Sequence, residues 1–330
     1  MKKINRKEVG LFAAVFLLAA AALFAGCVQE TGEQSSTTLD ERSFGEKVDY
    51  KITGIEPGAG MSGISEDIIE EYNLTGWSYQ PSSCSAMLAS MQDAYKNGEA
   101  IVVTGWEPHS LFALGDMRKL EDPKNIWNKP DETKKWLREY APRWADAEVA
   151  SDVAATVAYK GFRDDAPAAY ELLSRFNIPS DHQSQWIYAY TIEEREPGEI
   201  AQEYLENHPE MKESWMPEGL ELGKDSIILA GPAWPGVTVK NEVVALMLEE
   251  LGYAVERKQT DVAIVFTAIA DKQMDVILAA WLPNTHKDYY NKYNDDLDVV
   301  AVNLNMTWLG WVVPDYVDDD IQSIGDLRDA

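Results

Sequence analysis

Residues 101–108 read IVVTGWEP and residues 276–283 read VILAAWLP, and these two stretches decide the fold. Each is a short apolar run of strand type, and each ends in a Trp-x-Pro corner. The corner tryptophans, Trp106 and Trp281, are 175 residues apart (281 − 106). The matched corners indicate an internal repeat.

The two repeats share one succession of elements. The first starts at Ile52 and the second at Ile227, each 54 residues before its corner tryptophan (106 − 52 and 281 − 227). In each, a short strand meets a turn rich in Gly and Pro, PGAGMSG in the first and PAWPG in the second. A helix, a strand, a second helix and a third strand follow. We expect Ser65 and Thr238 to be the N-caps of the two first helices.

Strands that alternate with helices are typical of parallel sheets with right-handed crossovers. Two such units predict an α/β protein with two lobes, each a mainly parallel sheet flanked by helices. In open α/β sheets, ligands bind beyond the carboxyl ends of the strands, where both corners and both Gly/Pro turns lie. We therefore expect a ligand in the cleft between the lobes. The alternative is that both corner tryptophans pack under their own helices.

The segments outside the repeats are less regular. Residues 130–215 are expected to form helices separated by Pro and Asn. After Trp281 a polar helix precedes the apolar stretch 299–314, in which Trp308 and Trp311 are expected to pack in the core or at a hinge. The pattern predicts one lobe from residues 48–124 plus 313–330 and the other from residues 125–312.

The first 26 residues have the pattern of an export signal. Basic residues precede the apolar run Leu11–Phe24, which is shorter than the roughly 20 residues needed to span a membrane. Cys27 follows Ala-Gly, which resembles a lipobox, so we expect residues 1–26 to be removed and Cys27 to be lipidated. Residues 27–47 are polar and predict a flexible tether. The alternative is an uncleaved anchor helix, and either version leaves the folded part on the extracytoplasmic face of the cell membrane.

The chain of 330 residues is strongly acidic, with 29 Lys and Arg against 56 Asp and Glu and a net charge of −27. This charge argues against nucleic acid as a partner, because phosphate binding needs clustered Lys and Arg. It also disfavours docking of the folded surface on anionic lipid. We interpret it as a solvated surface suited to saline surroundings. Cation binding is the alternative, but the sequence has no acidic loop of calcium-binding type.

Several spaced motifs resemble the glycine betaine/proline betaine-binding proteins of ABC osmoprotectant importers. The resemblance covers about residues 48–330, in the chain order that places the GAG-containing lobe first. It implies a two-lobed fold of the type II periplasmic-binding-protein class, which closes over its ligand. The motifs are ITGIEPGAG (52–60), VVTGWEPH (102–109), LEDPK (120–124), LEELGYAV (248–255), AAWLPNTHKDYY (279–290) and VVPDYV (312–317).

The resemblance also implies a binding site. The family encloses a trimethylammonium group in three tryptophans and holds the ligand carboxylate with two backbone amides and one histidine. The matching residues in this sequence are Trp106, Trp234 and Trp281 for the cage and Gly60, Met61 and His286 for the carboxylate. The chain departs from many relatives at Met61, where Ile is common, and at Ser110, where a further Trp is common.

Simple estimates of binding energy agree with a site that has one part for the cation and one part for the carboxylate. A quaternary ammonium has no proton to donate, and each cation–π contact contributes roughly 0.5–2 kcal/mol. Three contacts therefore supply about 2–6 kcal/mol, whereas micromolar binding needs about 8 kcal/mol. The carboxylate end must supply the rest. Amides at a glycine-rich helix start and a ring N–H of His286, stronger if protonated, can do so. His109 is expected to bind the corner backbone rather than ligand.

The predicted function is thus capture of glycine betaine or proline betaine outside the cell and delivery to an ABC permease/ATPase complex. The alternative ligands are choline, carnitine or another quaternary amine, and a choline site would not need the carboxylate pocket. The sequence contains no Gly-x-Ser-x-Gly elbow, His-Glu-x-x-His motif or Cys/His nucleophile pair, so we do not expect an enzyme. No metal or cofactor is expected. The protein is expected to be a monomer that meets the membrane only through its lipid anchor.

Overall fold

The structure is a computed structural model that describes residues 42–328. The expected signal peptide, lipidated Cys27 and most of the expected tether lie outside this range. Within it, no helix is both long enough and apolar enough to cross a membrane.

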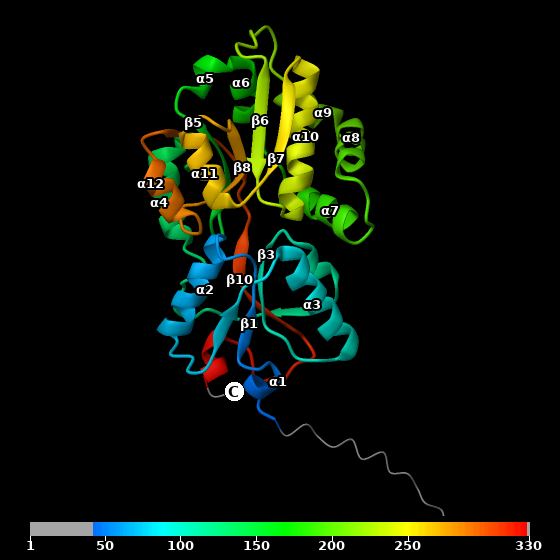
Figure 1. Ribbon diagram of the computed structural model, residues 1–330, viewed down its shortest axis with the longest axis vertical. Helices are drawn as coiled ribbons and strands as arrows, with labels where there is room; N and C mark the ends of the chain where they lie inside the picture. The colour runs from blue at the N-terminus through cyan, green and yellow to red at the C-terminus, as the bar shows by residue number, and fades with distance from the viewer. Residues whose placement is uncertain (1–41, 329–330) are drawn as a thin grey trace, which may run out of the picture. The chain divides into compact units, whose positions relative to one another are not determined.

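The first of two five-stranded sheets defines what we call lobe 1 (Figure 1). Its order is β2-β1-β3-β10-β4, in which β1 pairs in parallel with β2 and β3, and β10 pairs antiparallel with β3 and β4. The sheet is therefore mainly parallel, with one reversed strand. Its strands are β1 (Lys51–Thr53), β2 (Ser78–Gln80), β3 (Val103–Glu107), β4 (Met117–Lys119) and β10 (Trp308–Pro314).

The second sheet defines lobe 2 and repeats the arrangement of the first. Its order is β7-β6-β8-β5-β9, with β6 parallel to β7 and β8, and β5 antiparallel to β8 and β9. The predicted class is confirmed: an α/β protein with two related, mainly parallel sheets. Its strands are β5 (Val153–Tyr159), β6 (Ser226–Gly231), β7 (Ala254–Gln259), β8 (Val276–Leu282) and β9 (Leu297–Leu304).

Each sheet receives its reversed strand from chain that arrives from the other lobe. β5 comes after β4 of lobe 1, and β10 comes directly after β9 of lobe 2. The expected lobe boundary between residues 312 and 313 is therefore wrong, because β10 already pairs with β3 from Trp308 to Val312. Hydrogen bonding to a neighbouring strand, rather than the apolar pattern, decides to which lobe this segment belongs.

The expectation of helices throughout residues 130–215 is also wrong, because residues 153–159 form β5. All seven residues of β5 are buried, and neighbouring strands bond to both of its edges. A strand in such a position has no alternation of polar and apolar side chains. Its alanine-rich sequence therefore resembled helix.

Helices cover the sheets of both lobes (Figure 1). In lobe 1 they are α1 (Phe44–Lys47), α2 (Gly60–Glu71), α3 (Cys84–Asn97) and the 3-10 turns η1 (Ser110–Ala113) and η3 (Ile324–Arg328). In lobe 2 they are α4 (Pro130–Tyr140), η2 (Pro142–Trp144), α5 (Phe162–Asp165), α6 (Pro167–Arg175), α7 (Ser180–Thr191), α8 (Pro197–Asn207), α9 (Pro209–Trp215), α10 (Pro235–Leu251), α11 (Val262–Ala270) and α12 (Lys287–Tyr293).

Two helices begin earlier than the sequence predicted. The N-cap of α2 is Ala59 rather than Ser65, and the N-cap of α10 is Trp234 rather than Thr238. Proline at the first position of α10 explains its start, because its fixed φ suits a helix and its missing N–H costs nothing there. The earlier starts leave six residues between β1 and α2 and three between β6 and α10.

The described end of the expected tether is ordered. Ser43 and Glu46 form a capping box around α1, and Phe44 is buried with its ring 6.4 Å from that of Trp77. The prediction of a flexible tether is therefore wrong for residues 42–47. Besides the Phe44 ring, an ion pair between Lys47 and Asp318 at 2.8 Å holds this turn on lobe 1.

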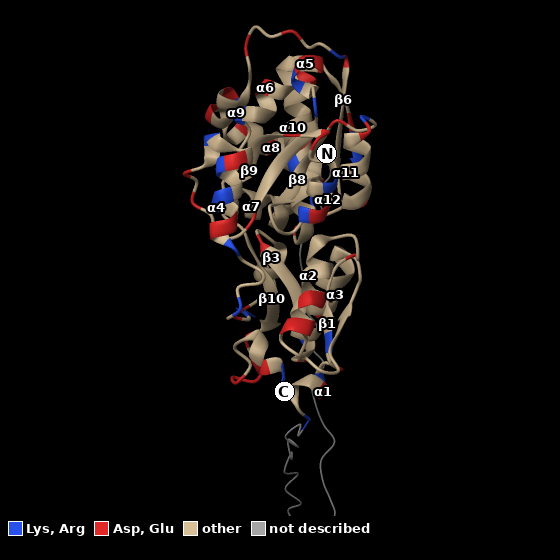
Figure 2. Ribbon diagram, turned by 90° about the vertical axis from the view of Figure 1, so that its left-hand side faces the viewer, with Lys and Arg blue, Asp and Glu red and all other residues tan. Residues whose placement is uncertain are grey.

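Acidic residues are spread over the helices and loops of both lobes (Figure 2). Among residues 42–328, no group of three or more His, Cys, Asp or Glu side chains is placed to hold a metal ion.

Candidate ligand-binding site

The two corner tryptophans occupy equivalent positions in the two lobes. Trp106 lies near the end of β3 and Trp281 near the end of β8, the third strand of each repeat. Each is followed by a cis peptide bond, Glu107–Pro108 in one lobe and Leu282–Pro283 in the other. The two Trp-x-Pro corners therefore share the same backbone feature as well as the same sequence pattern.

The first helices of the two lobes correspond in the same way. Their N-caps, Ala59 and Trp234, are also 175 residues apart (234 − 59). The third tryptophan of the predicted cage therefore stands where lobe 1 has a small residue followed by Gly60. One helix start presents an indole and the other presents bare backbone.

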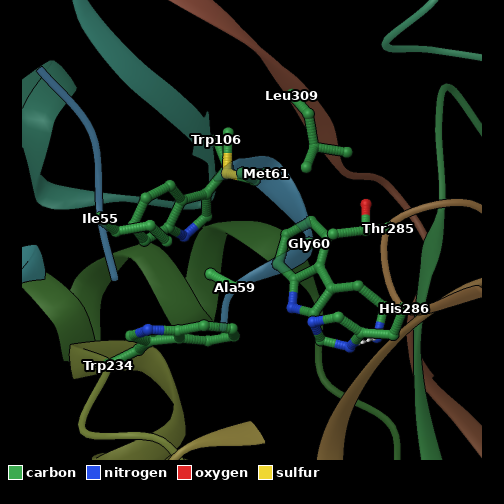
Figure 3. Close-up of a pocket in the computed structure, with 10 residues that line it drawn as sticks. Ile55, Ala59, Gly60, Met61, Trp106, Trp234, Thr285, His286 and Leu309 are labelled. Carbon is green, nitrogen blue, oxygen red and sulfur yellow. Dashed lines mark hydrogen bonds between the residues drawn. The ribbon is translucent and has the colours of Figure 1, made fainter. Parts of the chain in front are cut away.

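All six residues of the predicted site line one cavity between the lobes (Figure 3). The cavity encloses about 280 Å³ of space not filled by protein atoms, part of it open to solvent. Its lining is Ile55, Ala59, Gly60, Met61, Trp106, Trp234, Trp281, Thr285, His286 and Leu309. The role of the six predicted residues in binding remains a prediction.

The three indoles are largely withdrawn from solvent, with exposed fractions of 7% for Trp106, 8% for Trp234 and 7% for Trp281. The ring centroids of Trp106 and Trp234 are 6.3 Å apart at an interplanar angle of 51°. Of the eleven tryptophans, all within the described residues, only these three line the cavity. Tilted, water-poor indole faces are the arrangement in which cation–π attraction is strongest.

Gly60 is required by the close approach of the two lobes. A Cβ added to it would lie 1.8 Å from the carbonyl oxygen of Thr285, which belongs to lobe 2. Nearby, the Tyr289 hydroxyl donates to the carbonyl oxygen of Gly58 at 2.9 Å. The Gly-rich turn of lobe 1 therefore contacts the loop after β8 directly, and only glycine permits this approach.

The start of α2 offers unpaired amide groups to the cavity. Ala59 supplies no side-chain cap, and the amides of Gly60 and Met61 are in the first turn, where no intrahelical acceptor exists. The helix dipole adds partial positive charge at this point. The first turn of α2 is thus suited to hold an anionic group, and the role in carboxylate binding that the resemblance implies for Gly60 and Met61 stays a prediction.

His286 is buried, and its hydrogen bonding fixes its tautomer. Nδ1 accepts the backbone N–H of Trp281 at 2.9 Å, so the neutral ring carries its proton on Nε2. Nε2 is buried without a partner. Burial lowers the pKa of His286 to about 3. The ring is therefore a neutral donor near pH 7, and the extra strength expected from a protonated ring does not apply there.

The loop that carries His286 is held by Asp152, a residue the sequence analysis missed. Its carboxylate accepts the backbone N–H groups of Asn284 at 3.0 Å and Thr285 at 2.7 Å. Asp152 is fully buried, and burial raises its pKa despite these bonds. The sequence around Asp152 gave no signal for this contact, because the partners are more than 130 residues apart along the chain.

His109 is attached to the other corner. Its Nδ1 accepts the N–H of Leu111 at 2.9 Å, and its Nε2 lies 3.5 Å from the Cys84 sulfur. The ring centroid is 4.1 Å from that of Trp106. Burial lowers the pKa of His109 to about 3. As expected, this histidine binds the corner backbone, and it also buttresses Trp106.

A second cavity is lined by all three cage tryptophans and by Lys240 of α10. Lys240 is buried, and its Nζ donates to Asn303 Oδ1 at 2.6 Å. Burial without an acidic partner lowers its pKa to about 7. A group that titrates near neutral pH therefore shares a cavity with the three tryptophans that are predicted to hold a cation.

Glu56 is the other residue that the sequence analysis missed. The indole Nε1–H of Trp234 donates to Glu56 Oε1 at 2.7 Å, which joins the turn after β1 to the start of α10. Glu56 belongs to the motif ITGIEPGAG, so a signal was present in the sequence. Trp234 was also named from the sequence, but nothing in the sequence indicated that these two residues would bond to each other.

Two comparisons of sequence agree on one family. The family model described as the substrate-binding domain of the ABC-type glycine betaine transport system matches residues 35–207 and 225–330. The glycine betaine/carnitine transport binding protein GbuC of Listeria monocytogenes is 30% identical over 290 residues. That alignment covers 87% of this chain and 89% of the Listeria protein.

Two solved structures align in part. Lactococcal OpuAC, complexed with glycine betaine in a closed-liganded conformation, is 27% identical with a TM-score of 0.40, over 51% of this chain and 58% of that chain. A choline-binding protein of an ABC transporter in complex with choline is 23% identical with a TM-score of 0.42, over 60% of this chain and 61% of that chain. The chain thus spans less than two thirds of either. The family match covers both lobes and the Listeria relative nearly the whole chain, so this protein belongs to the family of substrate-binding domains of ABC-type glycine betaine transport systems.

Proposed function

We propose that this protein captures glycine betaine or proline betaine in the cavity between its lobes and delivers it to an ABC permease/ATPase complex for osmoprotection. The observation that carries the proposal is the meeting of three indoles with an unpartnered His286 Nε2 and a bare helix start in one small cavity. A betaine has the two matching ends, a methylated cation and a carboxylate.

The cationic end of the ligand belongs among Trp106, Trp234 and Trp281. Their faces attract a quaternary ammonium without offering hydrogen bonds that it cannot use. The ligand also need not displace tightly held water from these apolar walls. Family membership and the relative's name, which mentions glycine betaine and carnitine, support a ligand of this chemistry.

The carboxylate end belongs at Gly60, Met61 and His286. Two amides and a ring N–H are three donors for two carboxylate oxygens, and buried charge-assisted hydrogen bonds are stronger than neutral ones. Binding would also relieve the buried, unpartnered Nε2, which is otherwise unfavourable.

Binding of this kind couples to closure of the lobes. Gly60, Met61 and Trp106 come from lobe 1, whereas Trp234, Trp281 and His286 come from lobe 2. A ligand that touches both sets favours the closed arrangement. The closed form would be the one presented to the permease.

The decisive experiment is titration calorimetry of the purified folded part with glycine betaine, proline betaine and choline. We expect micromolar or tighter binding of a betaine and weaker binding of choline. Absence of binding for every quaternary amine would refute the proposal. Equal affinity for betaine and choline would remove the carboxylate pocket but keep the cage.

Choline or another cationic quaternary amine is a second candidate ligand, because Glu56 brings a carboxylate to the edge of the cage. A negative charge there favours ligands with net positive charge over zwitterions. The same titrations rank the candidates directly.

We further propose that the protein acts as a monomer on the extracytoplasmic face of the membrane, attached by lipid on Cys27. Substitution of Cys27→Ser should release it from membranes into the soluble fraction. Continued retention in the membrane fraction would favour an uncleaved anchor instead.

A further inference from the structure

Glu56 is placed where it can act on the cation without being part of the cage. Its carboxylate accepts the Trp234 indole N–H at 2.7 Å. None of the ion pairs found within residues 42–328 involves Glu56, so no Lys or Arg there neutralises its charge by direct contact. Trp234 is the one cage residue for which a bond from the indole N–H to a carboxylate is found within residues 42–328.

This hydrogen bond has two physical consequences. It fixes the orientation of the Trp234 ring, whose centroid lies 6.3 Å from that of Trp106. It also places negative charge at the edge of an indole face that would attract a cation, and because Glu56 is half-buried, solvent screens this charge only in part.

The bond is also made only when the lobes are together. Glu56 follows β1 in lobe 1, whereas Trp234 is the N-cap of α10 in lobe 2. Four residues after Glu56, the start of α2 at Gly60 attracts the opposite charge. One short turn therefore carries a group that favours cations and a group that favours anions.

We propose that Glu56 is a positioning and specificity residue, which orients Trp234 in the closed state and shifts the preference of the site toward quaternary amines with net positive charge, such as choline. This inference rests on the proposed function, because it assumes that a quaternary ammonium occupies the cage. A betaine gains from Glu56 at its cationic end and loses at its carboxylate end, whereas choline only gains.

The test compares Glu56→Gln, Glu56→Ala and Glu66→Gln with the wild type by calorimetric titration of choline and glycine betaine. Gln keeps an acceptor for the Trp234 N–H but removes the charge. We expect Glu56→Gln to weaken choline binding about fivefold and betaine binding less than twofold. Glu56→Ala also frees the Trp234 ring and should weaken both ligands. Glu66, exposed on α2, controls for the loss of one remote charge and should change neither affinity.

An indole N–H resonance provides a readout that does not depend on affinity. In the ligand-bound wild type, the Trp234 Nε1–H signal should shift strongly when Glu56 becomes Ala and only moderately when it becomes Gln. A purely structural role predicts equal losses for choline and betaine in Glu56→Gln, which would overturn the specificity claim, as would unchanged choline binding. If the wild type binds neither ligand, the proposed function fails first and this inference fails with it.

Discussion

The two lobes are built alike but end differently at the cavity. Both sheets follow the same strand order, with the reversed strand fourth in the row. At the start of its first helix, lobe 1 has Ala59 and Gly60, whereas lobe 2 has Trp234 and Pro235. One copy of the scaffold thus offers amides suited to an anion, and the other offers an aromatic face suited to a cation. The comparison teaches that two residues at a helix start, the N-cap and the residue after it, decide whether the start presents backbone amides or an aromatic side chain.

The two corner histidines show the same divergence. Each accepts a backbone N–H at Nδ1, and burial lowers the pKa of each to about 3. Nε2 of His109 faces the sulfur of Cys84 at 3.5 Å, whereas Nε2 of His286 has no partner. Only the histidine of lobe 2 retains a free donor for a ligand.

The largest expected effect comes from Gly60→Ala. The new Cβ would clash with the Thr285 carbonyl and hold the lobes apart, so we expect betaine affinity to fall about a hundredfold or more. Calorimetric titration measures the loss. Gly63→Ala in the same helix is the matched control, because nothing lies within 4 Å of its Cβ position. Equal behaviour of the two variants would show that the close contact does not matter for binding.

Trp281→Ala should weaken betaine binding at least tenfold while the fold stays intact, because one cation–π face is lost. Trp281→Phe keeps an aromatic face and should lose less. Trp144→Ala, which removes a tryptophan outside the cavity, should leave affinity unchanged. Unchanged affinity in Trp281→Ala, with circular dichroism confirming the fold, would exclude Trp281 from the site.

His286→Ala tests the difference between the two histidines. It should reduce betaine affinity about five- to tenfold and choline affinity much less, because only betaine has a carboxylate to accept the Nε2 proton. His109→Ala should reduce both equally, since it loosens Trp106 rather than a hydrogen bond to ligand. Calorimetric titration of each variant with betaine and with choline measures these losses. Equal loss for the two ligands in His286→Ala would assign this residue a structural role.

The smallest expected effect is a pH dependence of choline affinity, which we attribute to Lys240 of lobe 2. Burial lowers the pKa of Lys240 to about 7, so it becomes charged below that pH and should repel a cation held by the three tryptophans, with which it lines a cavity. Choline affinity should fall about two- to threefold from pH 8 to pH 6. The two buried histidines stay neutral over this range.

Lys240→Met removes the titrating group and should make choline affinity constant between pH 8 and pH 6. Calorimetry at three pH values for both proteins measures this difference. A slope that persists in Lys240→Met would assign the pH dependence to another group.

Prediction from the sequence succeeded where a signal was local or repeated. The corners at Trp106 and Trp281 were visible because apolar strands ended at the same offset in both halves. Motif resemblance indicated Trp234, Gly60, Met61 and His286, and these residues line the same cavity. Prediction failed for β5, because a strand buried on all sides lacks the alternation by which strands are recognised.

The sequence by itself determined the α/β class, the internal repeat and the residue types from which the site is built, because hydrophobic periodicity and glycine-rich turns are properties of neighbouring residues. Tertiary structure alone decided that Glu56 bonds to Trp234, that Asp152 holds the loop of His286 and that β10 belongs to lobe 1. Each of these depends on contacts between segments far apart along the chain. Such contacts form only when the sheets assemble and the lobes meet, and no local pattern encodes them.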